Sequence, residues 1–221
     1  MELTPAEARV LGALIEKHMT TPDHYPLTTA SLLAACNQTS NRSPVMHLDE
    51  AEAIEAMDSL RAQGLARTVK RTGERALKHL EIADEGLDLT REQKALLAVL
   101  LLRGSQTSGE LRLRTERYVQ LESLEEADRV LESMADADIP VAVLLDRVPG
   151  QKEPRWMHLL GGDVSDYEVA APESRDGVSE PVPSRLKLLE ADLARLRERV
   201  VALELRLEEG RWVDVEGRIG R

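Results

Sequence analysis

Apolar positions repeat one helical pattern twice along the chain. The stretches LTPAEARVLGALIEK, from Leu3, and LTREQKALLAVLLLR, from Leu89, begin alike and continue with apolar residues at helical spacing. In each stretch a threonine stands three residues before a Glu or Gln, which is the capping-box pattern of a helix start. The threonines are Thr4 and Thr90, and their partners are Glu7 and Gln93. We therefore expect two matching helices.

A second pair of similar segments follows. LDEAEAIEAM, from Leu48, and LEEADRVLES, from Leu124, each place acids ahead of an apolar stripe, and acids favour a helix N-terminus through the helix dipole. The first stripe is Ile54, Met57 and Leu60, and the second is Val130, Leu131 and Met134. Gly64 is expected to end the first helix and Pro140 the second. Between the paired helices, TTASLLAAC and SGELRLRTERY predict short middle helices.

A strand pair is expected after each set of helices. LARTVKR and RALKHLEI are joined by a turn at Thr72-Gly73, and VAVLLDRV and RWMHLL by the loop PGQKEP. The order of three helices and a hairpin, written twice, predicts two tandem winged-helix domains, residues 1–86 and 87–161. The hairpins would be their wings. The expected class is α+β, mainly α.

The last third of the chain has a different composition. Residues 162–183 are acidic with three prolines and predict a linker, residues 184–209 predict a coiled-coil helix, and residues 210–221 form a tail. Apolar residues recur at alternating intervals of three and four, which is a coiled-coil seam and predicts a homodimer. The seam residues are Leu186, Leu189, Leu193, Leu196, Val200, Leu203 and Leu207. Because Leu188 and Leu205 widen the stripe, a lone amphipathic helix that folds back on the domains is the alternative.

Charge and hydropathy restrict the partners and the location. The net charge is −11, from 40 acids and 29 bases. Because nucleic acid is also negatively charged, any binding to it must depend on local basic patches. The longest apolar run, residues 95–102, is too short to cross a membrane. The chain start lacks a signal-peptide pattern, so we expect a cytoplasmic protein that does not bind membranes.

Two basic or polar stretches are candidates for binding duplex DNA. The first hairpin carries Arg67, Lys70, Arg71, Arg75 and Lys78, and a basic wing can lie along a phosphate backbone. The stretch NQTSNRSP, residues 37–44, adds Asn41 and Arg42 near the expected recognition helix. The alternatives are a solvated hairpin whose charges block edge pairing, and turn chemistry in the 37–44 stretch. The expected third helices are acidic, which disfavours their entry into a DNA groove.

The tip of the second hairpin is a candidate protein-binding patch. Lys152, Arg155 and Trp156 lie together there, and an aromatic residue beside an arginine is a common interface anchor. The alternative is that Trp156 packs over its own hairpin, since the chain has few aromatic residues for its core.

The sequence contains few of the patterns that are typical of catalytic sites. The five histidines have no metal-ligand spacing, and the single cysteine, Cys36, is expected to be buried. The chain contains no phosphate-binding glycine loop or nucleophile elbow. We expect no enzyme activity, no catalytic residues, no metal and no cofactor.

Several of these motifs are also typical of one family. LTPAEARVLGALIEK, YPLT, ACNQTSNRSPV, EAMDSLRAQGL, GELRLRTER and VPGQKEPRWMHLL resemble the YceH-like family of uncharacterised bacterial proteins, over about residues 3–160. The resemblance implies two winged-helix domains and a bacterial, cytoplasmic protein, without an established function. Two hypotheses follow: a DNA-associated protein that binds through the first wing and residues 37–44, or a protein–protein interaction scaffold that does not bind DNA.

Overall fold

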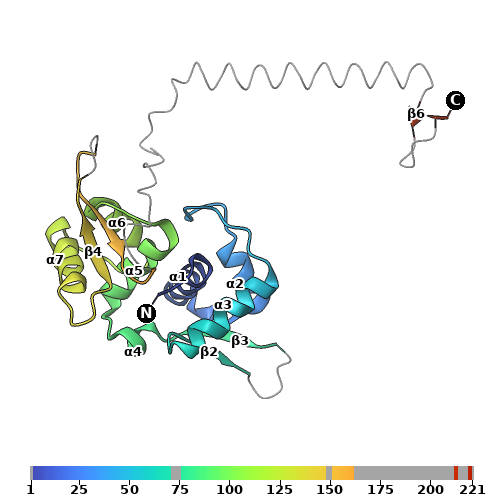
Figure 1. Cartoon of the computed structure of the whole chain (residues 1–221), viewed down its shortest axis with the longest axis horizontal. Coiled ribbons are helices and arrows are strands. Elements are labelled where there is room, and N and C mark those ends of the chain that lie inside the picture. The colour runs from blue at the N-terminus through green and yellow to red at the C-terminus, as the bar shows by residue number, and fades with distance from the viewer. Residues whose placement is uncertain (1, 71–75, 148–150, 162–211, 214–218, 221) are drawn as a thin grey trace. The chain divides into compact units, whose positions relative to one another are not determined.

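The computed structural model describes residues 2–70, 76–147, 151–161, 212–213 and 219–220 (Figure 1). Residues 1–168 form one compact unit and residues 169–221 form another. In the latter unit β6 (Trp212–Val213) pairs antiparallel with β7 (Ile219–Gly220). The expected linker and coiled-coil helix lie outside the described residues.

The first half of the compact unit, residues 1–86, contains three main helices and a small sheet. Its elements are α1 (Pro5–Thr20), the 3₁₀ turn η1 (Pro22–His24), β1 (Leu27–Thr28), α2 (Thr29–Cys36), α3 (Glu50–Ala62), β2 (Ala66–Val69), β3 (Lys78–Glu81) and α4 (Ala83–Leu87). The strand order is β1-β3-β2, and both pairings are antiparallel. The β2–β3 hairpin is the expected one, whereas β1, η1 and α4 were not predicted.

The second half, residues 87–161, repeats the order of three helices and a hairpin. Its elements are α5 (Arg91–Arg103), α6 (Ser108–Thr115), α7 (Leu124–Ala135), β4 (Ala142–Leu145) and β5 (Arg155–His158). β4 and β5 are antiparallel, with Leu144 opposite Trp156. The described part of the chain is thus α+β with seven α-helices and small antiparallel sheets, which confirms the predicted class.

Local sequence signals fix where several helices begin and end. Thr4 and Thr90 each form a complete capping box at the start of α1 and α5, as expected. Gly64, just beyond α3, has φ +74°, a left-handed conformation that favours glycine. α7 ends at Ala135, five residues before Pro140, the residue that was expected to end it. The predicted stripe of α3 is wrong at Ile54, which is 42% exposed because Ala53 and Ala56 face the core instead.

The two halves share one hydrophobic core. Residues 7–16 of α1 and residues 94–102 of α5 are buried without interruption, so both helices are covered on every side. A Cβ atom on Gly12 would lie 2.9 Å from Leu102 Cγ and 3.0 Å from Leu101 Cβ, because the absence of a side chain lets the two helices approach closely. Among the described residues, all buried apolar side chains except Ala53 and Met157 belong to a single cluster that spans both halves. Figure 1 shows α1 between α2 and α3 on one side and the second half on the other.

Candidate functional site

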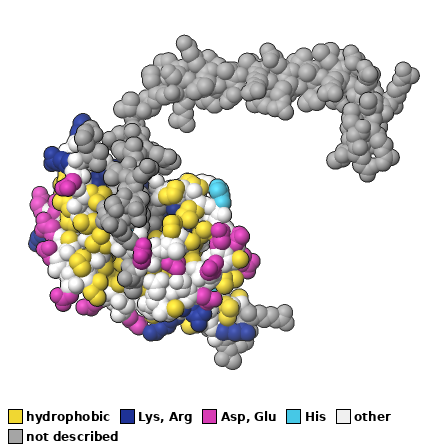
Figure 2. Space-filling model, viewed as in Figure 1, with side chains coloured by type: hydrophobic (Ala, Val, Ile, Leu, Met, Phe, Trp, Pro, Cys, Tyr) yellow, Lys and Arg dark blue, Asp and Glu magenta, His cyan; other side chains and the backbone are white. Residues whose placement is uncertain are grey.

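The β2–β3 hairpin carries most of the basic residues predicted to bind nucleic acid. Arg67 and Lys70 are exposed and Lys78 is half-buried, while Arg71 and Arg75 lie outside the described residues. A groove of about 540 Å³ at the base of the hairpin includes Arg61 and Arg67 in its lining. Figure 2 shows Lys and Arg side chains in dark blue along the lower edge of the compact unit, where this hairpin lies.

Two exposed ion pairs partly neutralise this surface. Arg67 Nη2 lies 2.9 Å from a Glu85 carboxylate oxygen, and Arg61 Nη1 lies 2.7 Å from Asp58 Oδ1. The four side chains are between 49% and 62% exposed, and exposed pairs of this kind contribute only ~0–1 kcal/mol. A bound anion can therefore replace Glu85 or Asp58 as the partner of its arginine at little cost in free energy.

Residues 37–44 form a loop that is held from inside the protein. The Asn37 side chain donates a hydrogen bond to the Leu48 carbonyl at 2.7 Å and accepts one from the Leu48 amide at 2.8 Å, which closes the loop. Asn41 has φ +60°, and its side-chain oxygen accepts a hydrogen bond from Arg103 of α5. Both asparagine side chains are thus bonded within the protein, to residues 11 and 62 positions away in the chain.

Arg42 is buried, with a side-chain exposure of 0%. Its guanidinium donates to Glu16 of α1 at 2.5 Å, and to the carbonyls of Ala35 and Asn41 and the side chain of Gln38. A side chain with this many internal acceptors and no exposed surface is not placed to contact DNA. The predicted role of Arg42 as a nucleic-acid contact does not fit this position.

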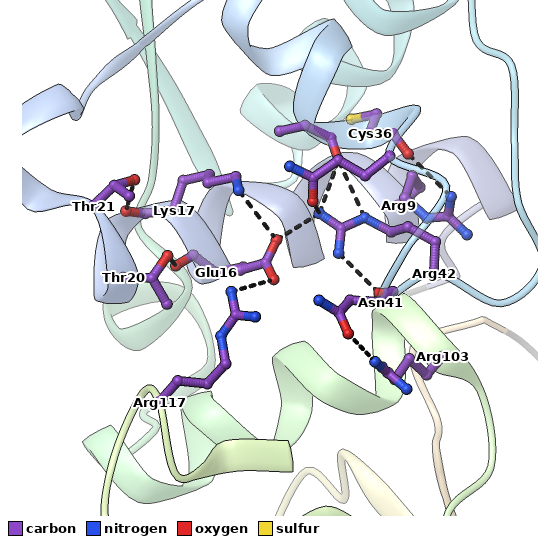
Figure 3. Close-up of polar contacts among 12 residues, drawn as sticks. Arg9, Glu16, Lys17, Thr20, Thr21, Cys36, Asn41, Arg42, Arg103 and Arg117 are labelled. Atoms are coloured by element: carbon purple, nitrogen blue, oxygen red, sulfur yellow. Dashed lines mark hydrogen bonds and ion pairs between the residues drawn. The ribbon is translucent and has the colours of Figure 1, made fainter. Parts of the chain in front are cut away.

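Glu16 is the centre of a polar cluster that joins the two halves (Figure 3). Besides Arg42, its carboxylate accepts hydrogen bonds from the Tyr118 hydroxyl at 3.1 Å and from Arg117 Nη2 at 3.3 Å, both from the second half. Burial raises the pKa of Glu16, but the hydrogen bond and charge of Arg42, together with the charges of Lys17 and Arg117, outweigh burial, and the net pKa is lowered. The carboxylate is therefore ionised in the folded protein at neutral pH.

A second buried carboxylate lies beside the sheet. Glu81 of β3 is contacted by Lys94 of α5 at 3.0 Å and by His18 at 2.6 Å, and the Ala83 amide donates to it at 2.8 Å. Burial raises its pKa, but these partners together lower it. Neither Glu16 nor Glu81 was predicted, because each lies in a helix or strand pattern that gives no local sign of a distant partner.

The tip of the second hairpin does not present Trp156. This side chain is only 5% exposed and donates its indole N–H to Ser108 at 3.1 Å, so the packing alternative accounts for it. Arg155 is paired with Glu110 at 2.9 Å, with 13% of its side chain exposed. Only Lys152, of the three predicted partner-binding residues, is exposed.

The third helix of each half presents acids to solvent. On α3 the exposed acids are Asp49 at the N-cap, Glu50, Glu52, Glu55 and Asp58. On α7, Glu125 and Glu132 are exposed. Figure 2 shows acidic side chains in magenta gathered at the left, over α7. Both helices therefore carry exposed acids, as their sequences indicated.

Two groups that could be reactive, Cys36 and His158, are buried. Burial raises the pKa of the Cys36 thiol to about 12 and lowers the pKa of His158 to about 4, so neither is suited to chemistry near neutral pH. Within the described residues no group of His, Cys, Asp and Glu side chains is arranged to hold a metal ion. No helix in the same residues is long and apolar enough to cross a membrane.

These features define an α+β protein of two similar halves with two buried carboxylates, Glu16 and Glu81, each paired with basic side chains. The chain belongs to a bacterial family of unknown function: the family model described as "Protein of unknown function, DUF480" matches residues 3–151. Among its relatives are the UPF0502 protein YceH of Salmonella paratyphi C (strain RKS4594) and that of Salmonella choleraesuis (strain SC-B67). Each is 42% identical over 217 residues, which covers 94% of this chain and 99% of the relative.

Proposed function

We propose that the chain is a tandem winged-helix protein that binds the phosphate backbone of duplex DNA through the β2–β3 hairpin. The observation that carries this proposal is the basic surface of the hairpin, where Arg67 and Lys70 are exposed and Lys78 is half-buried. It adjoins a groove that Arg61 and Arg67 line together with Asp58. The repeated order of three helices and a hairpin supports the winged-helix assignment. Basic hairpins can contact phosphates without reading bases.

The proposed interface is narrower than the one expected from the sequence. Arg42 is buried against Glu16, and Asn41 bonds Arg103, so the 37–44 loop supplies no charge to it. Since α3 exposes acids, it stays outside the DNA groove. Binding of this kind is weakly specific and strongly dependent on salt. The heptad residues lie outside the described part of the chain; a dimer through them would double the number of hairpins that reach one duplex.

The test is fluorescence anisotropy with a labelled duplex over a series of salt concentrations. We expect Arg67→Ala and Lys70→Ala each to reduce the slope of log affinity against log salt by ~1, the effect of one lost phosphate contact. Arg129→Ala is the matched control, because Arg129 is an exposed arginine on α7, away from the hairpin. Failure of the protein to bind any duplex at low salt excludes the proposal.

A protein–protein scaffold is the second candidate. The acidic exposed faces of α3 and α7 favour it, since they suit a basic partner better than DNA. Apolar Ile54 and Leu124 are 42% and 45% exposed on these helices, and could add contact area. Under this hypothesis, binding of a purified partner is lost in Glu55→Lys and unchanged by nuclease, whereas Lys70→Ala has no effect.

A further inference from the structure

The outer edge of the second hairpin is open at Leu144. Leu144 lies opposite Trp156 in the β4–β5 ladder, and the Trp156 amide and carbonyl both bond Gln106, on the far side of β5 from β4. When one residue of an antiparallel pair directs its backbone groups away from the partner strand, the opposite residue does the same. The N–H and C=O of Leu144 therefore point away from β5. Among the described residues β4 pairs only with β5, and Leu144 is 46% exposed.

The edge of β4 lacks the charges that protect the corresponding edge in the first half. β2 carries Arg67 within the strand and Lys70 directly after it, whereas β4 reads AVLL, without a charge. Natural sheets commonly place charged side chains on an edge strand, because these charges prevent another strand from pairing with it. The edge of β2 is therefore protected by charge, while β4 leaves an apolar strand available for pairing.

Acidic side chains flank this edge. Residues 130–146, from α7 to the residue after β4, contain four acids and no base. All four acids are exposed, and within the part of the chain that the structure describes none of them forms an ion pair. They are Glu132, Asp136, Asp138 and Asp146. The Val141 amide donates to the Met134 carbonyl at 3.1 Å, so the end of α7 lies beside the start of β4 (Figure 1).

An exposed isoleucine adds apolar surface near the same edge. Ile139, in the loop between α7 and β4, is 75% exposed, the highest value among the large hydrophobic side chains of the described residues. It comes directly after Asp138 and five residues before Leu144. At ~3.3 Å per residue, an extended segment of about six residues can reach from one to the other. A ligand that covers both therefore needs apolar side chains in an extended backbone, with basic side chains for the acids.

We propose that the β4 edge binds an extended segment of a partner protein that has an apolar centre and basic ends. The segment adds to the sheet as a strand: its backbone bonds Leu144, its apolar side chains cover Leu144 and Ile139, and its basic side chains pair with the flanking acids. A second copy of this chain is a poor occupant, because the acids of the two copies would meet along the shared edge and repel each other.

The proposal rests on the scaffold candidate and gives that candidate a surface and a partner chemistry. It is separate from DNA binding, because the β4 edge shares no residue with the β2–β3 hairpin. The two hairpins would then have different partners, the first a phosphate backbone and the second a basic protein segment.

The experiment is a titration of fluorescein-labelled peptides with the full chain, followed by fluorescence anisotropy. The probe is KKVTVKK, acetylated and amidated, which places two valines between basic ends. We expect KKVTVKK to bind saturably, EEVTVEE not to bind, and KKSTSKK, which keeps the charge without the apolar centre, to bind at least ~10-fold more weakly. N-methylation of the three central residues removes their backbone donors and should weaken binding to a similar extent, because strand pairing uses main-chain hydrogen bonds.

Two variants of the chain locate the site. Leu144→Lys adds a charge to the edge, as Arg67 does in β2, and should abolish binding. Asp138→Lys reverses an exposed charge in a loop, where it leaves the fold intact, and should weaken binding at least ~10-fold. Asp23→Lys is the matched control: it makes the same change of net charge at an exposed acid of η1, in the first half, and should bind as the parent does.

The proposal is overturned if KKVTVKK does not bind, if KKSTSKK or the N-methylated peptide binds as tightly, or if Asp138→Lys binds no more weakly than Asp23→Lys. Loss of binding in Glu55→Lys with full binding in Asp138→Lys also overturns it, but leaves the scaffold candidate standing, with the contact on α3. Conversion of the full chain from dimer to monomer by Leu144→Lys would assign the edge to a second copy instead.

Discussion

Replacing Glu16 by glutamine tests whether the buried ion pair with Arg42 is a structural support of the protein. The Glu16→Gln side chain keeps the shape of the original and removes its charge. Arg42 then remains as a cation with 0% of its side chain exposed and no carboxylate at 2.5 Å. Its hydrogen bonds to the Ala35 and Asn41 carbonyls stay in place, which limits the loss.

The expected loss follows from the burial of the pair. Removing one partner of a buried ion pair typically costs ~3–5 kcal/mol, because the other charge is left uncompensated. We expect about 3 kcal/mol, the lower end of that range, since carbonyl oxygens still solvate Arg42. In a chain of this size such a change lowers the melting temperature by roughly 6–12 °C. By contrast, Asp58→Asn breaks the exposed pair with Arg61 and should cost ~0–1 kcal/mol.

The assay is urea unfolding at pH 7, followed by far-ultraviolet circular dichroism, with Asp58→Asn as the control. Acid should also act differently on the two proteins. The pKa of Glu16 is lowered by folding, so its contribution is present above the unfolded value and lost as pH falls through the folded value. Glu16→Gln should therefore show a shallower loss of stability in acid. If Glu16→Gln is destabilised no more than Asp58→Asn, the reasoning is wrong.

Three further predictions concern the core, a buried histidine and the C-terminal region. Gly12→Val should destabilise the protein by about 3 kcal/mol, because even a Cβ meets Leu102 at 2.9 Å. Gly109→Ala, whose Cβ would make only an ordinary contact with Thr107 Oγ1 at 4.0 Å, should be neutral or slightly stabilising in the same urea assay. Because burial lowers the pKa of His158 to about 4 from 6.5, the unfolded chain binds the proton first as pH falls, and the parent should lose about 2 kcal/mol more than His158→Leu between pH 7 and pH 5. If the parent and His158→Leu lose the same free energy of unfolding between pH 7 and pH 5, His158 is not buried in its neutral form. Deleting residues 184–221 should convert a dimer to a monomer in analytical ultracentrifugation, and an unchanged number of chains per particle would exclude dimerisation through the heptads.

The parts of the fold that sequence predicts well are those set by neighbouring residues. The capping boxes at Thr4 and Thr90 and the glycine beyond α3 act within one helical turn, and the structure has each where it was expected. The two hairpins follow from runs of strand-forming residues. Ile54 was misplaced because alanines at 53 and 56 carry too little hydrophobic signal to identify the buried face of α3.

The candidate site was harder to predict, because its contacts join residues far apart in the chain. Arg42 lies in a polar stretch that resembles a surface loop. Its side chain is nevertheless buried, because it pairs with Glu16, which lies 26 residues earlier in the chain. Tyr118 reaches the same carboxylate from 102 residues away. Local composition gives no sign of such partners. The packing of Trp156, the alternative to partner binding, could be considered from the sequence alone, because a chain with 2% aromatic residues has few large side chains to cover its hairpins.

The close approach of α1 and α5 at Gly12 also decides what either half can do alone. A fragment that ended near residue 86 would leave the α5-facing side of α1 in water, and a fragment that began there would leave α5 equally bare. Neither piece is expected to be autonomous: each should aggregate on expression, and recover solubility when the complementary piece is supplied in the same cell. The repeated order of elements thus lies within one compact unit that shares a single core.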